Sequence, residues 1–237
     1  MKEKHKYHFH DYLNIVLFYS VFISFFVASI MGLVALIKGE LPTNKFIYRV
    51  LLTFVVCLPY IIKKIFRFKI STLVTSMIYV YIFLAGFLGV VLEFYSTLLW
   101  WDVVIHFLMG LMLSVFSIYI LNATIYKKDI SKHNMFFTGL FMIIFAVAVC
   151  AMWEMGEYLV DGILKTSFQR YETYGGIGYF GRMALEDTMI DLLMGFAGAI
   201  AGVCIIILIQ SYYGALLKTF KIKKLKKREE DVECIEE

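Results

Sequence analysis

The chain has 237 residues, of which 61% are hydrophobic and only 18% charged, with a formal net charge of +4 and a mean hydropathy of +0.77. Soluble domains average roughly 45–50% apolar and about 25% charged residues, so this chain has too little polar surface to coat a water-soluble body. Two prolines and 17% aromatic residues also exclude disordered, collagen-like and low-complexity classes. The composition therefore predicts an integral membrane protein.

Six apolar segments are predicted to cross the membrane as helices. Five of them offer about the 20 apolar residues that a span requires, without any Asp, Glu, Lys or Arg. The five are residues 12–37, 70–92, 103–126, 135–153 and 192–217. A shorter segment, 46–62, contains Arg49 and Pro59. We predict that it also spans, with Arg49 reaching the interface, although a re-entrant segment is the alternative.

The distribution of Lys and Arg predicts the orientation of these spans. With six spans, 17 of the 23 basic residues fall on the face that carries both termini, and 6 fall on the other face. Because cytoplasmic loops carry the excess of Lys and Arg, we predict a multi-pass protein of the cell membrane with an N-in/C-in orientation. The expected fold is an all-α polytopic helix bundle.

The chain divides into two predicted regions. Residues 1–217 form the transmembrane domain, and residues 218–237 form a charged cytoplasmic tail whose basic part is attracted to anionic lipid. The four cysteines, Cys57, Cys150, Cys204 and Cys234, form no CxxC pair. The cysteine spacing therefore predicts neither a disulfide framework nor a thiolate zinc site.

Three short motifs concentrate ionisable residues at the outer ends of the last three spans. They are WWDVVIHF at 100–107, WEMGE at 153–157 and EDTMID at 186–191. Each motif places two ionisable side chains three or four residues apart, and therefore on one face of a helix. The three pairs are Asp102 with His106, Glu154 with Glu157, and Asp187 with Asp191.

The three motifs together predict one pocket of carboxylates with a single imidazole. Carboxylates packed this closely repel each other unless protons, basic partners or a cation are present. Oxygen-rich sites with one histidine suit divalent ions such as Mn, Fe, Zn, Mg or Ca. We predict a divalent metal ion as the cofactor, held by a set of five ligands. These are Asp102, His106, Glu157, Asp187 and Asp191. Arg182, the nearest basic residue in the sequence, offers another means of neutralising an acid or of holding a phosphate.

Structural explanations are the alternative for several of these residues. Asp102 suits an N-cap of the fourth span, with a hydrogen bond to the histidine one turn later. Trp100 and Trp101 are typical of an interfacial aromatic belt. Glu154 and Glu157 are harder to explain in this way, because acids at the carboxyl end of a helix oppose its dipole.

Two further segments carry expectations about packing. The outer segment 162–185, rich in glycine and aromatic residues, is either a lid over the acidic pocket or an interfacial loop. Gly198 and Gly202 lie on a small-residue face of the last span, which predicts close helix packing. The neighbouring helix comes either from the same chain or from another copy.

At the three motifs the sequence resembles bacterial YjdF-like membrane proteins and, more distantly, VanZ-like ones. The resemblance extends over residues 101–202, and the first three spans match only in hydropathy. VanZ-like proteins usually have Lys at the position of Val103, Gln at Glu157 and Asn at Asp191, so the YjdF-like match is closer. The matching residues are Asp102, His106, Phe107, Gly110, Glu154, Glu157, Asp187, Thr188, Asp191, Gly195, Gly198 and Gly202. The resemblance implies a multi-pass envelope protein without a settled biochemical activity.

The residues favour a metal-assisted hydrolase or transferase that acts at the outer leaflet on a lipid or a lipid-linked envelope precursor. In this hypothesis the catalytic groups are His106, Glu154 and Glu157, with one of the two glutamates as general base. Alternatives are a proton- or cation-coupled transporter that uses the same acids, or a non-catalytic membrane scaffold. The expected partners are membrane lipid and a lipid-linked substrate, not nucleic acid, and the oligomeric state is left open.

Overall fold

The computed structural model of the chain describes residues 9–66, 68–69, 72–124, 135–173, 176–213 and 223–224. Within these residues the protein is a bundle of long apolar helices with two short strands. Six helical stretches are long and apolar enough to cross a membrane, as the composition predicts. Their apolar outer faces carry many exposed Leu, Ile, Val, Phe and Met side chains, which suits a surrounding solvent of lipid chains.

The elements are long helices in chain order, with two short helices and two short strands between or after them. The long ones are α1 (Phe9–Ile37), α2 (Thr43–Phe66), α3 (Thr72–Ile82) with its continuation η1 (Phe83–Val91), α5 (Trp100–Thr124), α6 (Met135–Leu164) and α7 (Glu186–Tyr213). The short helices are α4 (Phe94–Thr97) and η3 (Gly181–Leu185). The strands β1 (Phe68–Lys69) and β2 (Lys223–Lys224) pair with each other in antiparallel orientation.

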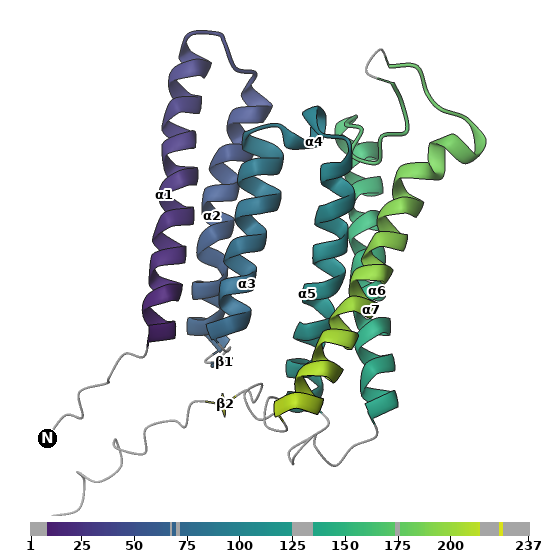
Figure 1. The fold of residues 1–237 in the computed structure, drawn as a ribbon. Coiled ribbons are helices and arrows are strands. Elements are labelled where there is room, and N and C mark those ends of the chain that lie inside the picture. The colour runs from purple at the N-terminus through teal and green to yellow at the C-terminus, as the bar shows by residue number, and fades with distance from the viewer. Residues whose placement is uncertain are drawn as a thin grey trace, which may run out of the picture.

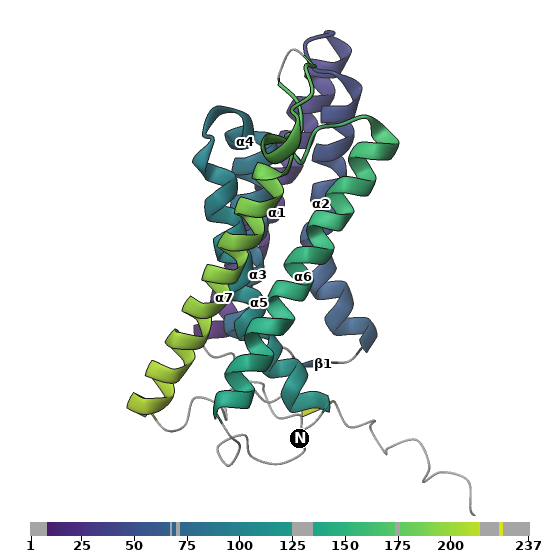
Figure 2. The same cartoon turned by 90° about the vertical axis from the view of Figure 1, so that its right-hand side faces the viewer.

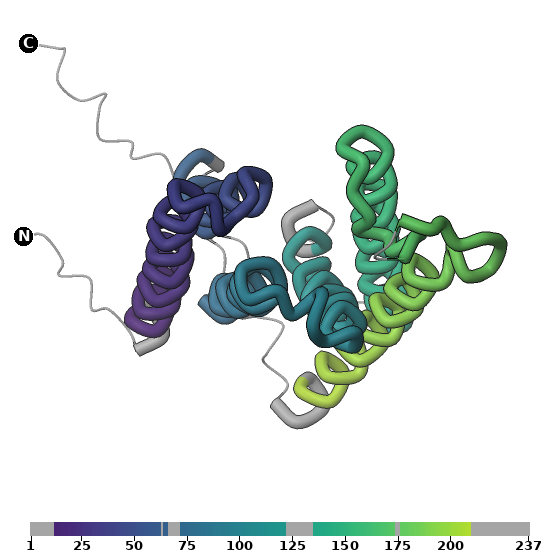
Figure 3. Tube along the Cα trace, turned by 90° about the horizontal axis from the view of Figure 1, so that it is seen from above, coloured from purple at the N-terminus to yellow at the C-terminus, as the bar shows by residue number. Residues whose placement is uncertain are grey.

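The bundle consists of two groups of three spans. Figures 1 and 3 show α1, α2 and α3 on one side and α5, α6 and α7 on the other. The first group packs around buried apolar side chains that include Phe25, Val56 and Tyr79. The second group packs around Ile118, Met142 and other buried residues, and α3 also contributes to that cluster. α3 and α5 are therefore the helices that join the two groups.

The two ends of the bundle differ in what they carry. One end bears α4 and residues 165–173 and 176–185, and we call it the site end (Figure 1). α1 begins and α7 ends at the opposite end, which we call the basic end because the predicted excess of Lys and Arg falls there. The predicted tail, 218–237, lies outside the described residues except for Lys223–Lys224. The cytoplasmic assignment of the basic end remains a prediction.

The segment predicted at 46–62 belongs to one continuous helix, α2, which is long enough to span the membrane. Pro59 lies inside this helix. Proline removes one backbone hydrogen bond, which neighbouring helices and side chains can compensate in a membrane span. The structure therefore has a spanning helix at 46–62 and not a re-entrant segment.

The predicted limits of the last two spans were wrong where they adjoin the site. α6 continues to Leu164 instead of ending at Trp153, and α7 begins at Glu186 instead of at residue 192. The additional turns carry acidic residues, which made them look like loop segments in a hydropathy-based prediction. Glu154, Asp161 and Asp191 are buried inside the bundle, where they face other polar groups instead of lipid, so the helices can continue through them.

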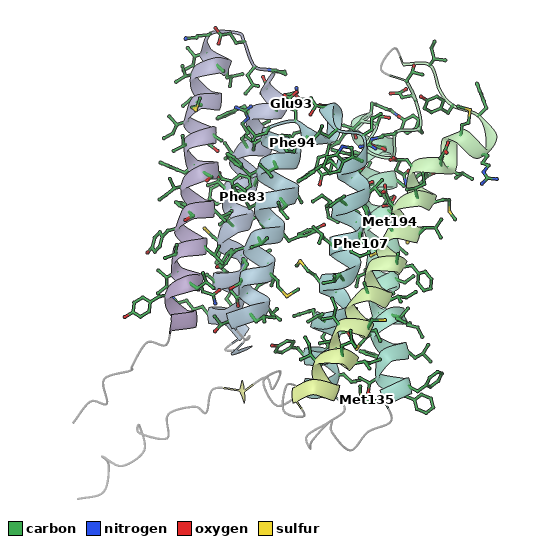
Figure 4. The ribbon with its side chains drawn as sticks, viewed as in Figure 1. Phe83, Glu93, Phe94, Phe107, Met135 and Met194 are labelled. Atoms are coloured by element: carbon green, nitrogen blue, oxygen red, sulfur yellow. The ribbon has the colours of Figure 1, made fainter. Side chains whose placement is uncertain are left out.

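The helix α3 changes to π-helical winding in its second half, η1. Such winding frequently occurs at functional sites. Gly89 lies in this stretch, and a methyl group there would overlap the ring of Tyr95. The glycine thus allows the segment after η1 to fold back closely over the end of the helix. Figure 4 shows Glu93 and Phe94 at this turn, on the site end.

The closest helix contact is the crossing of α5 and α7. A methyl group at Gly110 would overlap the carbonyl oxygen of Gly195, and one at Gly198 would overlap that of Phe107. Gly202 makes a similar approach to Ser114. The small-residue face predicted at Gly198 and Gly202 therefore packs against α5 of the same chain. Figure 4 shows Phe107 on α5 and Met194 on α7 near this crossing.

Candidate functional site

A buried group of three ionisable side chains lies at the site end of the α5–α7 crossing. Asp102 and His106 come from the first turns of α5, and Asp191 comes from the second turn of α7. One ligand atom from each residue lies within 4.8 Å of the others. His106 Nε2 is 3.5 Å from Asp102 Oδ1 and 3.9 Å from Asp191 Oδ2. The glycine contacts between α5 and α7 explain why the two helices are close enough for these side chains to meet.

Glu154 of α6 completes the surroundings of the imidazole. Its Oε1 lies 3.7 Å from His106 Nδ1, on the side of the ring opposite Nε2. Glu154 is only 4% exposed, and neither of its carboxylate oxygens has a hydrogen-bond partner within the described part of the chain. A buried carboxylate without donors is unfavourable, so this position is ready for a donor such as His106 Nδ1–H.

One arginine neutralises part of the acidic group. Arg170 Nη2 is 3.0 Å from Asp102 Oδ2, and Arg170 Nη1 is 3.2 Å from Asp187 Oδ1. The same guanidinium group donates to the backbone carbonyl of Tyr95. Arg170 therefore links α5, α7 and the segment after η1.

The loop that supplies Arg170 is fixed by another buried carboxylate, Asp161 of α6. Asp161 is 4% exposed and accepts hydrogen bonds from the Thr166 hydroxyl and from the backbone amides of Phe168 and Gln169. Gln169 in turn donates to the backbone carbonyl of Glu154 and to the Thr188 hydroxyl. The first part of the loop thus folds onto the site.

The backbone of the loop is strained at Arg170, whose φ of 45° lies in the left-handed region. A non-glycine residue in this region costs about 1–3 kcal/mol unless its surroundings compensate. Here the ion pairs to Asp102 and Asp187 hold the side chain on the site. Further along the loop, Phe180 is 88% exposed. The first part of the segment therefore contacts the site through Arg170, whereas the later part, at Phe180, is exposed.

Glu157 is set apart from the three-residue group. Its Oε1 accepts a hydrogen bond of 2.8 Å from the indole nitrogen of Trp153, one turn earlier on α6. The prediction placed Glu154 and Glu157 at the end of a helix, but α6 continues to Leu164. The argument from the helix dipole was therefore wrong, because neither acid lies at the last turn.

The tryptophans of the first motif have different roles. Trp100 is 56% exposed, in agreement with an interfacial belt, whereas Trp101 is buried against Phe94. For Trp101 the belt interpretation was therefore wrong. Asp102 is the third residue of α5, not its cap, and it binds Arg170.

The structure brings together some of the predicted ligands and separates others. Asp102, His106 and Asp191 form the group. Asp187 makes an ion pair with Arg170 instead. Glu157 accepts a hydrogen bond from Trp153. Four functional residues were missed in the sequence. They are Tyr95, Asp161, Gln169 and Arg170. No sequence signal separates Arg170 from Arg182, because the choice depends on the turn that follows Asp161. Arg182 itself is exposed.

The fold and the site define a multi-pass helical membrane protein with a buried Asp/His/Asp group at one end of the bundle. A family model described as predicted membrane protein (DUF2238) matches residues 15–212. The chain belongs to this DUF2238 family of predicted membrane proteins.

A protein from Thermotoga maritima, described as an uncharacterized protein, is 28% identical to this chain over 140 residues. The match covers 59% of this chain and 65% of that relative, so the chain spans slightly less than two thirds of the relative's length. No solved structure matches the chain.

Proposed function

We propose that Asp102, His106 and Asp191 bind a divalent metal ion, and that this site makes the protein a membrane hydrolase or transferase. The observation that carries the proposal is the buried meeting of one imidazole and two carboxylates from two helices. Buried ionisable residues within membrane spans are costly and usually functional. The residues that resemble those of YjdF-like proteins include all three of these proposed ligands.

The donor set suits a divalent ion in both geometry and charge. Two ligands with bonds of about 2.1 Å to one ion lie at most about 4.2 Å apart, and Nε2 of His106 lies 3.5 and 3.9 Å from the two aspartates. Asp102, Asp187, Asp191 and Glu154 outnumber Arg170, the arginine paired with two of them. A cation balances the remaining negative charge. One histidine and oxygen ligands suit Mn, Fe, Zn or Mg.

Each residue then has a distinct role. A bound ion would lower the pKa of a water ligand or polarise a phosphoryl or carbonyl oxygen. Glu154 Oε1 lies 3.7 Å from His106 Nδ1, and with an ion bound at Nε2 it would accept a hydrogen bond from Nδ1–H and so direct Nε2 towards the two aspartates. Glu157, which is half-buried and outside the ligand group, is the candidate general base. Arg170 is held near the site and is suited to an anionic substrate group.

The proposed substrate is a lipid or a lipid-linked envelope precursor, processed at the outer leaflet in the N-in/C-in orientation. The position of the site supports this class, because Asp102 and Asp187 lie in the first turns of their helices, near the end of the bundle. Transporters usually bind their substrate near the middle of the membrane, between repeated halves. The location therefore favours an enzyme over a proton- or cation-coupled transporter.

Metal analysis of the purified protein tests the proposal. After dialysis, elemental analysis is expected to find a stoichiometric transition metal or Mg, and titration with Mn²⁺ is expected to saturate at the same stoichiometry. His106→Ala and Asp191→Asn should both abolish this binding. Glu186→Gln is the matched control, because Glu186 is an exposed acid in the same turn of α7 as Asp187. Metal binding that survives in both site variants would refute the proposal.

A lipid assay separates the enzyme from its alternatives. The metal-loaded protein, in vesicles that contain a fluorescent diacyl phospholipid or a polyprenyl diphosphate, is expected to release a cleaved product. A Glu157→Gln variant should keep the metal and lose most of the product. Uptake of Mn²⁺ or protons into protein-containing vesicles, without any product, would instead identify a transporter.

A further inference from the structure

A second candidate site is a groove of about 760 Å³ between α3 and α5. Leu13 of α1 also lines it, and the other apolar walls include Met77, Leu84, Leu108 and Met112. None of the lining residues is charged. The hydroxyl of Ser76, one of the few polar lining groups, donates to the side chain of Asn14 and needs no ligand. The chemistry of the walls therefore selects an apolar occupant.

The depth of the groove identifies this occupant as a hydrocarbon chain. All of its lining residues lie in the candidate spans Tyr12–Ile37, Thr72–Val91 and Trp100–Leu121. It extends from Thr72, the first residue of α3 at the basic end, to Leu84 and Leu108 near the middle of the bundle. At this depth the solvent is lipid, and water has too few polar partners to fill such a space.

Segments that carry lysines lie at the basic end, next to the beginning of α3. β1 immediately precedes α3 and pairs with β2, so that Lys69 lies opposite Lys223 and Phe68 opposite Lys224. The last turn of α2 adds Lys64, whose side chain is exposed. The backbone therefore places lysine positions from three separate segments, the end of α2, β1 and β2, at the basic end, where α3 begins. Clusters of this kind attract anionic lipid headgroups.

We propose that this groove binds one acyl chain of an anionic phospholipid from the leaflet at the basic end. The chain lies between α3 and α5, and the phosphate lies at the basic end, where β1 pairs with β2. The groove ends close to the acidic site, because Leu108, one of its lining residues, follows His106 by two residues on α5. The lipid would thus contact the helix that carries two of the proposed metal ligands, but its binding does not require the metal.

Photocrosslinking tests the position of the chain. The full-length protein in nanodiscs receives a phosphatidylglycerol with a diazirine in its acyl chain, or the phosphatidylcholine with the same chain. After illumination, mass spectrometry is expected to find the phosphatidylglycerol label on peptides that contain Met77 and Leu108, in clear excess over the phosphatidylcholine label. Equal labelling by both lipids, or labelling spread evenly over exposed residues such as Ile144 and Met152, would overturn the proposal.

Variants test the groove and the lysines separately. Met77→Trp fills the groove, and the matched control Met31→Trp changes a methionine that is 64% exposed on α1. A combined Lys64→Gln, Lys69→Gln and Lys223→Gln variant removes charge at the basic end, with Lys38→Gln and Lys165→Gln as its control at the site end. Both test variants are expected to lower phosphatidylglycerol labelling by about tenfold. Unchanged labelling in either would contradict the proposal.

The outcome for the groove can be distinguished from that for the metal site. Mn²⁺ titration of Met77→Trp should give the same stoichiometry as the unmodified protein. If the metal site fails its own test, the expected labelling pattern stays the same. If Met77→Trp does not fold, labelling of the unmodified chain still decides the proposal, because its peptides either carry the label or do not.

Discussion

His106 Nδ1 and Glu154 Oε1 lie 3.7 Å apart in the interior of the bundle, and neither His106 Nδ1 nor the Glu154 carboxylate has a hydrogen-bond partner among the described residues. A histidine that binds a metal usually donates its second N–H to a carboxylate or a carbonyl group. The pair therefore resembles a metal ligand together with the group that orients it. Glu154 acts through His106 and is a positioning residue in this interpretation.

The orienting role predicts a specific effect of Glu154→Gln. Loss of such an outer partner typically weakens metal binding about 10–100-fold, so the Mn²⁺ dissociation constant should rise by about that factor in a calorimetric titration. Glu157→Gln is the control, because its carboxylate is bonded to Trp153 and lies outside the ligand group. Equal effects of the two substitutions would contradict the assignment.

Asp161 is the residue on which the loop over the site depends. Asp161→Asn removes the charge that accepts two backbone amides and one hydroxyl. Hydrogen bonds to charged groups contribute about 1.5–3 kcal/mol each to stability, so hydrogen exchange at 166–170 should accelerate strongly. Exchange in the core of α5 should stay unchanged. A loop that remains protected in Asp161→Asn would show that Asp161 does not hold it.

At the scale of the helices, the crossing of α5 and α7 positions the site. Gly110 and Gly195 bring the two backbones into direct contact, and Gly198 does the same one turn further along. In membranes, small residues allow close packing without a hydrophobic driving force between helices. The approach of these backbones is what carries Asp191 to His106, although the two residues are far apart in sequence.

Alanine substitutions at glycine separate this contact from ordinary helix preference. Gly110→Ala is expected to destabilise the protein by about 1–3 kcal/mol, because the new methyl group overlaps the backbone of α7. Gly156→Ala, on α6, meets no atom within 4 Å and should be neutral or stabilising by up to about 1 kcal/mol. Thermal unfolding in detergent measures both. Similar midpoints for the two variants would mean that the helices can separate at little cost.

The whole molecule has two groups of spans and two chemically different ends. Figure 2 shows α5, α6 and α7 from the side, with the site end above and the basic end below. The acids of the site lie at one end, whereas most Lys and Arg of the sequence are predicted to lie at the other. This division gives the proposed metal site and the proposed lipid groove separate positions along α5, which forms the metal site with α7 and the groove with α3.

The orientation of the molecule can be tested with reporter fusions. A green fluorescent protein joined after residue 217 should fluoresce, because the basic end is predicted to face the cytoplasm. An alkaline phosphatase inserted after residue 172 should be active, because the site end is predicted to face outward. The reversed pattern would place the site on the cytoplasmic side and would exclude an outer-leaflet substrate.

The sequence by itself determined that the protein belongs in a membrane, that it has six candidate spans, and that each ionisable pair lies on one face of a helix. These properties are local, since they depend on composition, on runs of apolar residues and on the 3.6-residue period. The extents of α6 and α7 were predicted less well, because hydropathy treats an acid as an end of a span even where the bundle interior surrounds it.

Only the tertiary structure decided which of the predicted residues meet. Asp191 reaches His106 through a glycine contact between two helices, Glu157 is held by Trp153, and Arg170 reaches the site through the turn at Asp161. None of these pairings is encoded in a local pattern. They arise because backbones that lie far apart in the sequence approach within van der Waals distance, and the free energy of that approach depends on both partners at once.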